Sequence, residues 1–297
     1  MKKYVIDEEF LSSLDVLETL LKHNVAGMFG GNKRSRNNAA YGSSSEFADH
    51  RDYIPGDDIA RIDWNSYARF DKLYLKLFHD ERQMHTRIYI DASRSMDYGK
   101  GMKAEQAVKL AAAIAYISVN EMDRVSIYTI KDDCVTEIVP PTVGRDSFFT
   151  RIDRLNSIEF DGDSRISEAI LPSTVGMGDG MSVIISDFLT DNDFETAIEH
   201  LISKKRDVFC LQVLSLEEIN PQLTGKMHLF DAENSDKTYK RNIDKDVLNA
   251  YRAALEYSKK RIADYCFSRG ASYLLVSAED DVIQVIFDRL EALEVVR

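Results

Sequence analysis

The sequence predicts an α/β protein with a mostly parallel sheet that carries helices on both faces. From residue 86 onward, short apolar runs alternate with longer segments whose apolar residues recur at helical spacing. The run over 181–186 is apolar almost throughout, which is typical of a parallel strand buried on both faces. The helical segment over 102–119 places small residues on one face, which allows close packing on a sheet. Such alternation of strands and helices indicates this fold class.

The individual elements follow from the same periodicity. Strands are expected over 86–90, 124–130, 135–139, 181–186, 208–214 and 272–276, and helices over 102–119, 145–155, 194–202, 246–268 and 282–293. The turn at Asp132 and Asp133 predicts that the second and third strands form a hairpin. A further hairpin is expected between 227–230 and 237–241.

The N-terminal part differs in character from the rest. We expect residues 1–80 to form a helical and irregular extension packed on a main domain over 81–297. Residues 7–23 have the apolar spacing of a helix, and residues 73–78 that of a strand. Charged and aromatic residues alternate densely over 42–78, which favours arginine–carboxylate pairs that hold an irregular segment. An exposed recognition surface is the alternative.

Composition restricts the function classes. The 297 residues include 50 acids and 38 bases, for a net charge of −12, which argues against general binding to nucleic acid or anionic membranes. The three cysteines lie too far apart to indicate a disulfide framework or a zinc site. The N-terminal residues turn acidic before an apolar segment forms, and the longest apolar stretch is too short to cross a bilayer. We therefore predict a cytoplasmic protein without a membrane span.

Acidic and hydroxyl side chains follow two of the expected strands. Asp91, Ser93 and Ser95 come directly after the strand over 86–90, and Asp187 follows the strand over 181–186. Ligands of parallel sheets bind beyond the carboxyl ends of the strands, and magnesium prefers oxygen ligands. These residues therefore predict a metal site. The simpler alternative is that Asp91 and Ser95 only cap the following helix.

The three-loop pattern resembles the metal-ion-dependent adhesion site of von Willebrand factor type A domains. Asp91, Ser93 and Ser95 match the first loop of that site, and Asp187 matches the acid of the third. The resemblance implies a hydroxyl ligand from a middle loop, for which Ser164 is the best match. Asp163 and Ser167 remain alternatives for this ligand.

A longer series of short motifs resembles the bacterial family called domain of unknown function 58. They occur at 45–47, 51–53, 55–58, 61–64, 68–69 and 91–96, then at 229–233, Tyr251 and 270–273. Members of that family often carry two membrane helices ahead of this region, and no such helices are evident in this sequence. The resemblance implies, by association, a MoxR-type AAA+ ATPase as the partner.

A site of this composition suits binding better than catalysis. Ser93, Ser95 and Ser164 would bind magnesium directly, whereas Asp91 and Asp187 would hold its water ligands. The neutral direct ligands leave the ion electrophilic, with one position open for a carboxylate of a protein partner. Manganese and calcium are alternative ions. We expect a non-enzymatic, metal-dependent protein-binding module that works as an adaptor.

An enzymatic alternative stays open at this point. Asp91, Asp163 and Asp187 could supply the carboxylates of a magnesium-dependent phosphohydrolase or nuclease. A phosphatase that uses Asp91 as its nucleophile would need a second acid at the position of Ser93. Serine hydrolases and nucleotide-binding proteins are less consistent with the sequence, which contains neither a G-x-S-x-G motif nor a Gly-Lys-Ser/Thr motif.

Overall fold

The protein consists of two compact units. The computed structural model describes residues 6, 10, 12–14, 47–78, 84–98, 102–174, 180–190, 192–223, 225–230 and 238–286. One unit comprises Met1–Ala26 and Met84–Arg297, and the other comprises Gly27–Gln83. Of the helix predicted over 7–23, residues 10 and 12–14 are described and helical, and the rest lies outside the described residues. The predicted packing of residues 1–80 on the main domain stays a prediction.

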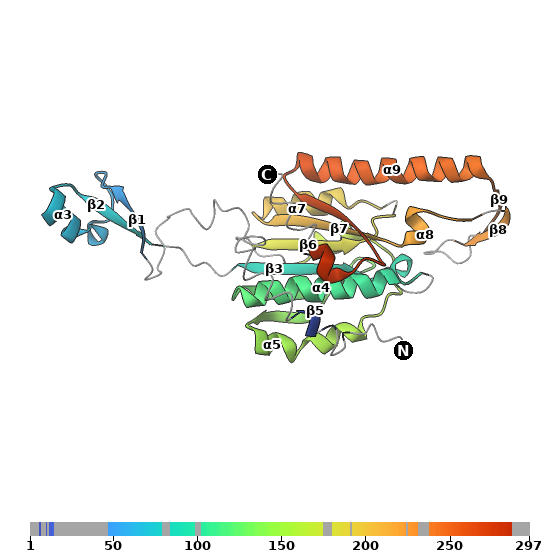
Figure 1. The fold of residues 1–297 in the computed structure, drawn as a ribbon, viewed down its shortest axis with the longest axis horizontal. Helices are drawn as coiled ribbons and strands as arrows, with labels where there is room; N and C mark the ends of the chain where they lie inside the picture. Colours follow the sequence, from blue (N-terminus) through green and yellow to red (C-terminus); the bar gives the residue numbers. More distant parts are fainter. Residues whose placement is uncertain are drawn as a thin grey trace. The chain divides into compact units, whose positions relative to one another are not determined.

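A six-stranded sheet forms the centre of the larger unit. Its strands lie in the order β10-β7-β6-β3-β4-β5, and all neighbours are parallel except the antiparallel pair β4 and β5. Their bounds are β3 (His85–Asp91), β4 (Arg124–Lys131), β5 (Cys134–Val143), β6 (Met181–Ser186), β7 (Asp207–Leu214) and β10 (Ser272–Ser277). The predicted fold class and the predicted hairpin are confirmed (Figure 1).

Helices cover both faces of this sheet. The helices of the larger unit include α4 (Met102–Asn120), α5 (Arg145–Phe149), α6 (Ile166–Ile170), α7 (Glu195–Ser203), α8 (Leu216–Ile219), α9 (Lys245–Ser268) and α10 (Val282–Gln284). The long helix α4 packs on the strands, and α5 and α10 pack against it. A predicted hairpin is also present, with β8 (Gly225–Phe230) antiparallel to β9 (Thr238–Ile243).

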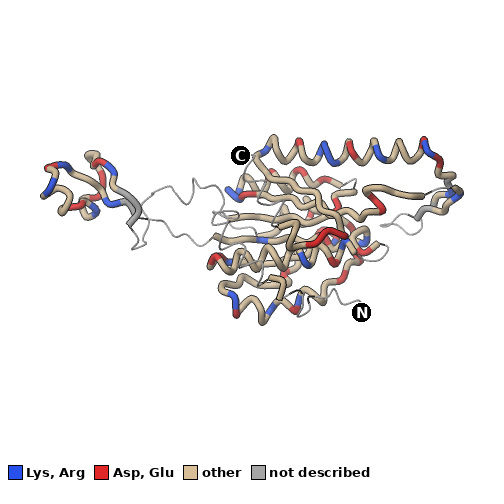
Figure 2. The backbone as a smooth tube through the Cα atoms, viewed as in Figure 1, with Lys and Arg blue, Asp and Glu red and all other residues tan. Residues whose placement is uncertain are grey.

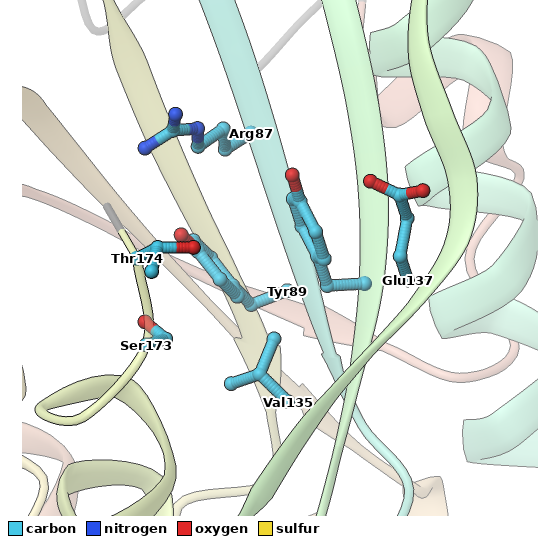
Figure 3. A pocket seen from close by; sticks show the side chains of 7 residues that line it. Arg87, Tyr89, Val135, Glu137, Ser173 and Thr174 are labelled. Atoms are coloured by element: carbon cyan, nitrogen blue, oxygen red, sulfur yellow. The ribbon is translucent and has the colours of Figure 1, made fainter. Parts of the chain in front are cut away.

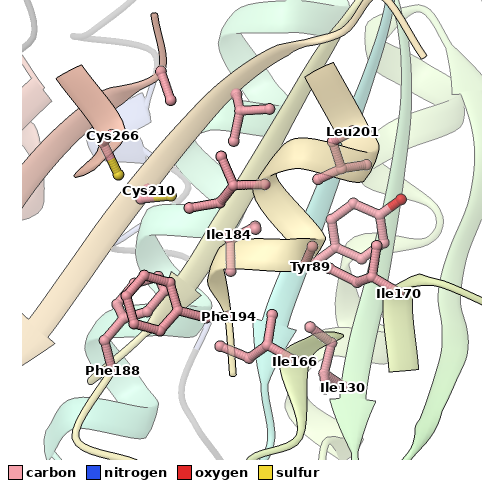
Figure 4. Close-up of a cluster of buried hydrophobic side chains, with 14 of the residues drawn as sticks. Tyr89, Ile130, Ile166, Ile170, Ile184, Phe188, Phe194, Leu201, Cys210 and Cys266 are labelled. Atoms are coloured by element: carbon pink, nitrogen blue, oxygen red, sulfur yellow. The ribbon is translucent and has the colours of Figure 1, made fainter. Parts of the chain in front are cut away.

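The core explains why these segments fold as they do. All six residues of β6 are buried, which requires cover on both faces. On one face, Ile184 belongs to a cluster that includes Phe194 from the segment before α7 and Ile262 from α9 (Figure 4). On the other, the almost wholly buried α4 offers alanines that let it approach the strands closely.

The strand order also defines where a ligand site would lie. The chain continues from β3 to its neighbour β4 on one side, whereas β6 lies on the other side of β3. In sheets of this type, the crevice at such a reversal of strand order is the usual ligand site. Asp91 is the last residue of β3 and Ser186 the last of β6, so both lie at this point.

The smaller unit contains more regular structure than predicted. Strands β1 (Phe47–Asp52) and β2 (Tyr74–Phe78) are antiparallel. Between them, the chain forms the 3₁₀ helix η1 (Ile59–Arg61) and helix α3 (Trp64–Phe70). The prediction of an irregular segment with one strand was therefore wrong for β1 and α3. Asp63 caps α3 by accepting a hydrogen bond from the Asn65 N–H at 3.1 Å, a local signal that is easily missed among other charges.

The predicted arginine–carboxylate pairing in this unit is confirmed. Arg51 Nη2 lies 2.8 Å from Asp57 Oδ1. Asp63 also accepts hydrogen bonds from the Ser66 hydroxyl at 2.7 Å and pairs with His50 Nε2 at 2.8 Å. These two contacts hold the pKa of Asp63 well below its usual range, and the hydrogen bond from Ser66 has the larger effect. Polar contacts therefore stabilise a unit that contains few buried apolar side chains in its described part.

The helix predicted over 145–155 is broken. Helix α5 ends at Phe149, and the 3₁₀ helix η3 (Ile152–Ser157) follows. The Thr150 hydroxyl donates to the carbonyl oxygens of Ser147 (2.9 Å) and Asp146 (3.3 Å), and such bonds compete with helix propagation. The last predicted helix, over 282–293, begins at Val282, and residues beyond 286 lie outside the described part.

Candidate metal site

The Asp91 carboxylate is the centre of the predicted site. It is fully buried at the end of β3. Its Oδ2 accepts hydrogen bonds from the hydroxyls of Ser164 at 2.7 Å and Ser186 at 2.6 Å, and its Oδ1 accepts one from the Ser93 N–H at 3.0 Å. One carboxylate therefore joins three loops that are far apart in the sequence.

The first loop presents two hydroxyls side by side. Ser93 is buried and Ser95 partly buried, and their Oγ atoms lie 3.0 Å apart. Backbone hydrogen bonds join this loop to Gly162 of the middle loop, which donates to Ala92 O at 3.2 Å and accepts from Arg94 N at 2.9 Å. A Cβ atom at Gly162 would lie 2.6 Å from Lys131 Cγ. Glycine therefore permits the close approach of the middle loop to the end of β4.

The middle loop brings only one of its three candidate ligands to Asp91. Ser164 is fully buried and donates to the carboxylate. Asp163 instead lies 3.8 Å from Arg165 Nη2, with 38% of its side chain exposed. Ser167 accepts a hydrogen bond from the Ala197 N–H at 3.0 Å in the first turns of α7. Geometry thus favours the predicted Ser164 over its two alternatives.

The third loop adds a second buried acid. Asp187 directly follows β6 and is 1% exposed. Its Oδ1 accepts from the Leu189 N–H at 3.1 Å, and its Oδ2 accepts from Lys103 Nζ at 2.9 Å. The next residue, Phe188, is buried with a φ of 50°, which a bulky residue rarely adopts. Such backbone strain is often found at functional sites.

Burial and charge shape the protonation of the site. Burial, followed by the negative charge of Asp187, raises the pKa of Asp91 above its ordinary value, although its hydroxyl partners oppose this. Burial alone would lower the pKa of Lys103, but the charges of Asp187 and Glu218 outweigh it and raise the pKa. Further acids lie at this edge on α8 (Figure 2). Acidic side chains therefore outnumber basic ones around Asp91.

The oxygen atoms of the first loop suit an octahedral ion. Bonds of about 2.1 Å to Mg²⁺ place neighbouring ligand oxygens about 3.0 Å apart, and Ser93 and Ser95 already have this separation. Within the described part of the chain, no three His, Cys, Asp or Glu residues are grouped so that they could hold a metal. An ion at Asp91 would therefore depend on serine hydroxyls.

Three residues at the site were not predicted as site residues. Ser186 donates to Asp91, Lys103 pairs with Asp187, and Glu218 pairs with Lys103 at 2.6 Å. Ser186 has a sequence signal, since it ends a buried strand beside the predicted ligand Asp187. The two charged residues have none, because a lysine at the start of one helix and a glutamate on another are usually exposed.

A pocket of about 330 Å³ lies elsewhere, beside β3, β4 and β5 (Figure 3). Arg87, the stacked rings of Tyr89 and Tyr128, and Glu137 contribute to its lining. Two guanidinium nitrogens of Arg87, Nε and Nη1, are buried without a hydrogen-bond partner among the described residues. None of the predicted metal ligands lines this pocket.

The sequence pattern of the family "Protein of unknown function DUF58" matches residues 49–261, well over half of the chain. The chain belongs to this family. Uncharacterized proteins of Mycobacterium bovis and Mycobacterium tuberculosis are 27% identical to it over 235 residues, which cover 77% of this chain and 72% of each relative. The predicted family resemblance is confirmed.

Several solved structures are similar to this DUF58 protein, and a von Willebrand A (VWA) domain is among them, each with a TM-score below 0.5. BatB from Bacteroides thetaiotaomicron is 16% identical with a TM-score of 0.42, over 72% of this chain and 98% of that one. The SpRpn10 VWA domain is 10% identical with a TM-score of 0.40, over 70% and 97%. An aerotolerance-related membrane protein from Bacteroides fragilis is 15% identical with a TM-score of 0.39, over 71% and 96%.

The predicted cytoplasmic location is wrong. The similar structure from Bacteroides fragilis is that of an aerotolerance-related membrane protein. The lack of a long apolar segment in the sequence of this chain does not place the protein in the cytoplasm. In the described part of this chain, no helix combines the length and apolar character needed to cross a membrane.

Proposed function

We propose that this DUF58 protein is a non-enzymatic, divalent-metal-dependent protein-binding module. The observation that carries the proposal is the Asp91 carboxylate, which gathers Ser93, Ser164 and Ser186 from three loops at the reversal of strand order. A carboxylate held by hydroxyls, beside a second buried acid and two adjacent serine oxygens, suits Mg²⁺, with Mn²⁺ or Ca²⁺ as alternatives.

Some residues of the site would contact the ion directly, and others would contact it through its water ligands. Ser93, Ser95 and Ser164 would bind the ion, and Asp91 and Asp187 would orient its water ligands and these hydroxyls. When bound, the ion supplies a Lewis-acidic position for an incoming carboxylate. The buried charges of Asp91 and Asp187 would repel such a carboxylate without the ion, so partner binding should require metal.

The partner we propose is a MoxR-type AAA+ ATPase or its client, which offers an aspartate or glutamate to the site. Support comes from the family to which the chain belongs, since the resemblance to that family implies such an ATPase by association. The protein would then act as an adaptor that joins the ATPase to another protein.

The test measures metal binding and partner binding separately. Calorimetric titration with MgCl2 should show binding to the wild type and strong loss in Ser93→Ala and Asp91→Ala. Ser203→Ala removes an exposed hydroxyl that donates to a carbonyl of its own helix, and this variant should bind Mg²⁺ like the wild type. Surface-immobilised protein should capture a purified MoxR-type ATPase in magnesium and release it in chelator. Capture that survives chelation and both site variants would disprove the mechanism.

The enzymatic alternative has less support. It requires Asp163 to join Asp91 and Asp187, but the Asp163 carboxylate is partly exposed beside Arg165. Both oxygens of Asp91 already accept hydrogen bonds, which leaves this carboxylate poorly suited to act as a nucleophile. Metal-dependent release of phosphate by the purified protein would reverse this preference.

A further inference from the structure

Lys103 is a buried ammonium group that two acids share. It belongs to the first turn of α4 and is 3% exposed. Its Nζ lies 2.9 Å from Asp187 Oδ2 and 2.6 Å from Glu218 Oε1. Asp187 is 1% exposed, whereas the Glu218 side chain is 24% exposed. The ammonium group therefore neutralises an acid that the proposed metal would also need.

Glu218 is held in place by its own helix and by α9. Its Oε2 accepts from the Ser215 N–H at 2.8 Å, and its own N–H donates to the Ser215 hydroxyl at 3.2 Å, so the two residues form a capping box at α8. The Ser215 hydroxyl also donates to Oε2 at 3.0 Å. Its backbone oxygen accepts from the Tyr251 hydroxyl of α9 at 2.9 Å. The second acid of Lys103 is thus a fixed part of the structure, unlike the mobile ends of most surface ion pairs.

We propose that Lys103 is a tethered counter-ion that competes with the divalent cation for Asp187, and that Glu218 sets the strength of this competition. The inference rests on the proposed metal-binding function and deepens it by adding a regulator. An ammonium group at hydrogen-bond distance from Asp187 offsets the charge that attracts a cation, and it repels the cation directly. Glu218 weakens this effect by drawing Lys103 toward itself.

Because Asp187 and Glu218 share Lys103, substitutions of Lys103 and of Glu218 should change the Mg²⁺ affinity in opposite directions. Lys103→Met removes the competing charge, so Mg²⁺ should bind about tenfold more tightly. Glu218→Gln leaves Lys103 to Asp187 alone, so Mg²⁺ should bind about tenfold more weakly. Both affinities can be measured by calorimetric titration of the full chain with MgCl2.

Two control variants distinguish the effect of the Lys103 ion pairs from the effect of a changed net charge. Lys109→Met removes another lysine of α4, which pairs with Glu105 instead. Glu217→Gln removes the exposed acid next to Glu218 on α8. Each changes the net charge as its partner variant does, so both should keep the wild-type affinity within about twofold.

The outcomes distinguish this inference from the proposed function. Wild-type affinity in both folded test variants, or weaker binding in Lys103→Met, overturns the competition while the metal site stands. No Mg²⁺ binding by the wild type, by Lys103→Met or by the controls overturns the metal site and the competition with it. If Lys103→Met does not fold, Glu218→Gln carries the test, because it keeps Lys103 paired with Asp187.

Discussion

The two ends of the parallel sheet bury opposite charges and satisfy them differently. At the carboxyl end, Asp91 and Asp187 are paired mainly with side chains, namely serine hydroxyls and Lys103. At the amino end, Arg206 is 5% exposed and donates to the backbone oxygens of His85 and Met181. Side-chain partners can exchange for a ligand without disturbing the strands, whereas backbone partners cannot.

The amino end therefore has the properties of a structural clamp. Arg206 joins the first residues of β3 and β6 while it precedes β7, and its Nε donates to the Ser182 hydroxyl at 2.6 Å. Burial, followed by the charge of Arg87, lowers the pKa of Arg206 to about 10, which leaves it charged at neutral pH. A buried charge thus indicates a binding site only where its partners are free to rearrange.

The largest effect should come from removing the clamp. Arg206→Met leaves two buried carbonyls and Ser182 without their donor, so we expect a loss of about 3–5 kcal/mol in the free energy of unfolding. Urea unfolding measures this loss. The control Arg261→Met breaks an exposed pair with Glu195 and should cost less than about 1 kcal/mol. Equal losses in both variants would contradict the comparison.

A second test crowds the clamp without removing it. Gly180 has a φ of 150°, and a Cβ atom there would lie 2.5 Å from His85 O and 3.1 Å from Arg206 Nη1. We expect Gly180→Ala to lower the free energy of unfolding by about 2–3 kcal/mol. Gly56→Ala is a suitable control, because it also has positive φ but nothing within 4 Å of the added Cβ. A similar loss in the two variants would mean that backbone strain alone is responsible.

A smaller effect should separate two neighbouring serines. Ser167→Ala removes the acceptor of the Ala197 N–H, so it should cost about 1 kcal/mol of stability and leave Mg²⁺ affinity unchanged. Ser164→Ala removes a proposed metal ligand, so Mg²⁺ affinity should fall strongly. Thermal unfolding and calorimetric titration of both variants would measure the two effects separately. Loss of Mg²⁺ binding in Ser167→Ala would mean that Ser164 was the wrong choice of middle-loop ligand.

The smallest effect concerns the pH dependence of stability in chelator. The pKa of Asp91 is raised in the folded protein, so the folded state binds this proton more tightly than the unfolded state. The contribution of Asp91 to stability should therefore decline as the pH rises from 3.8, the ordinary pKa of this carboxyl, through its raised pKa in the folded protein. Asp91→Asn lacks this titration, and the stability of the wild type relative to Asp91→Asn should fall over that range. A difference that does not vary with pH would disprove the raised pKa.

Much of the fold could be predicted because it depends on local periodicity. The apolar run of β6 and the small-residue face of α4 specify buried elements regardless of their neighbours. The break after α5 could not be predicted in this way, because the Thr150 hydroxyl competes with the helix for its carbonyl groups. Strand β1 was missed because its sequence, Phe-Ala-Asp-His-Arg-Asp, lacks an apolar strand pattern, so only its pairing with β2 reveals it.

Local pattern was enough to identify candidate site residues, since Asp91 ends one recognisable strand and Asp187 directly follows another. Which hydroxyls meet these acids depends on tertiary contacts, because the direction of a hydroxyl in a loop is set by distant segments. The tertiary structure placed Ser164 on Asp91, turned Asp163 toward Arg165, and buried Lys103 between Asp187 and Glu218. Long-range pairing of buried charges has no local pattern, because each partner looks like an ordinary surface residue in the sequence.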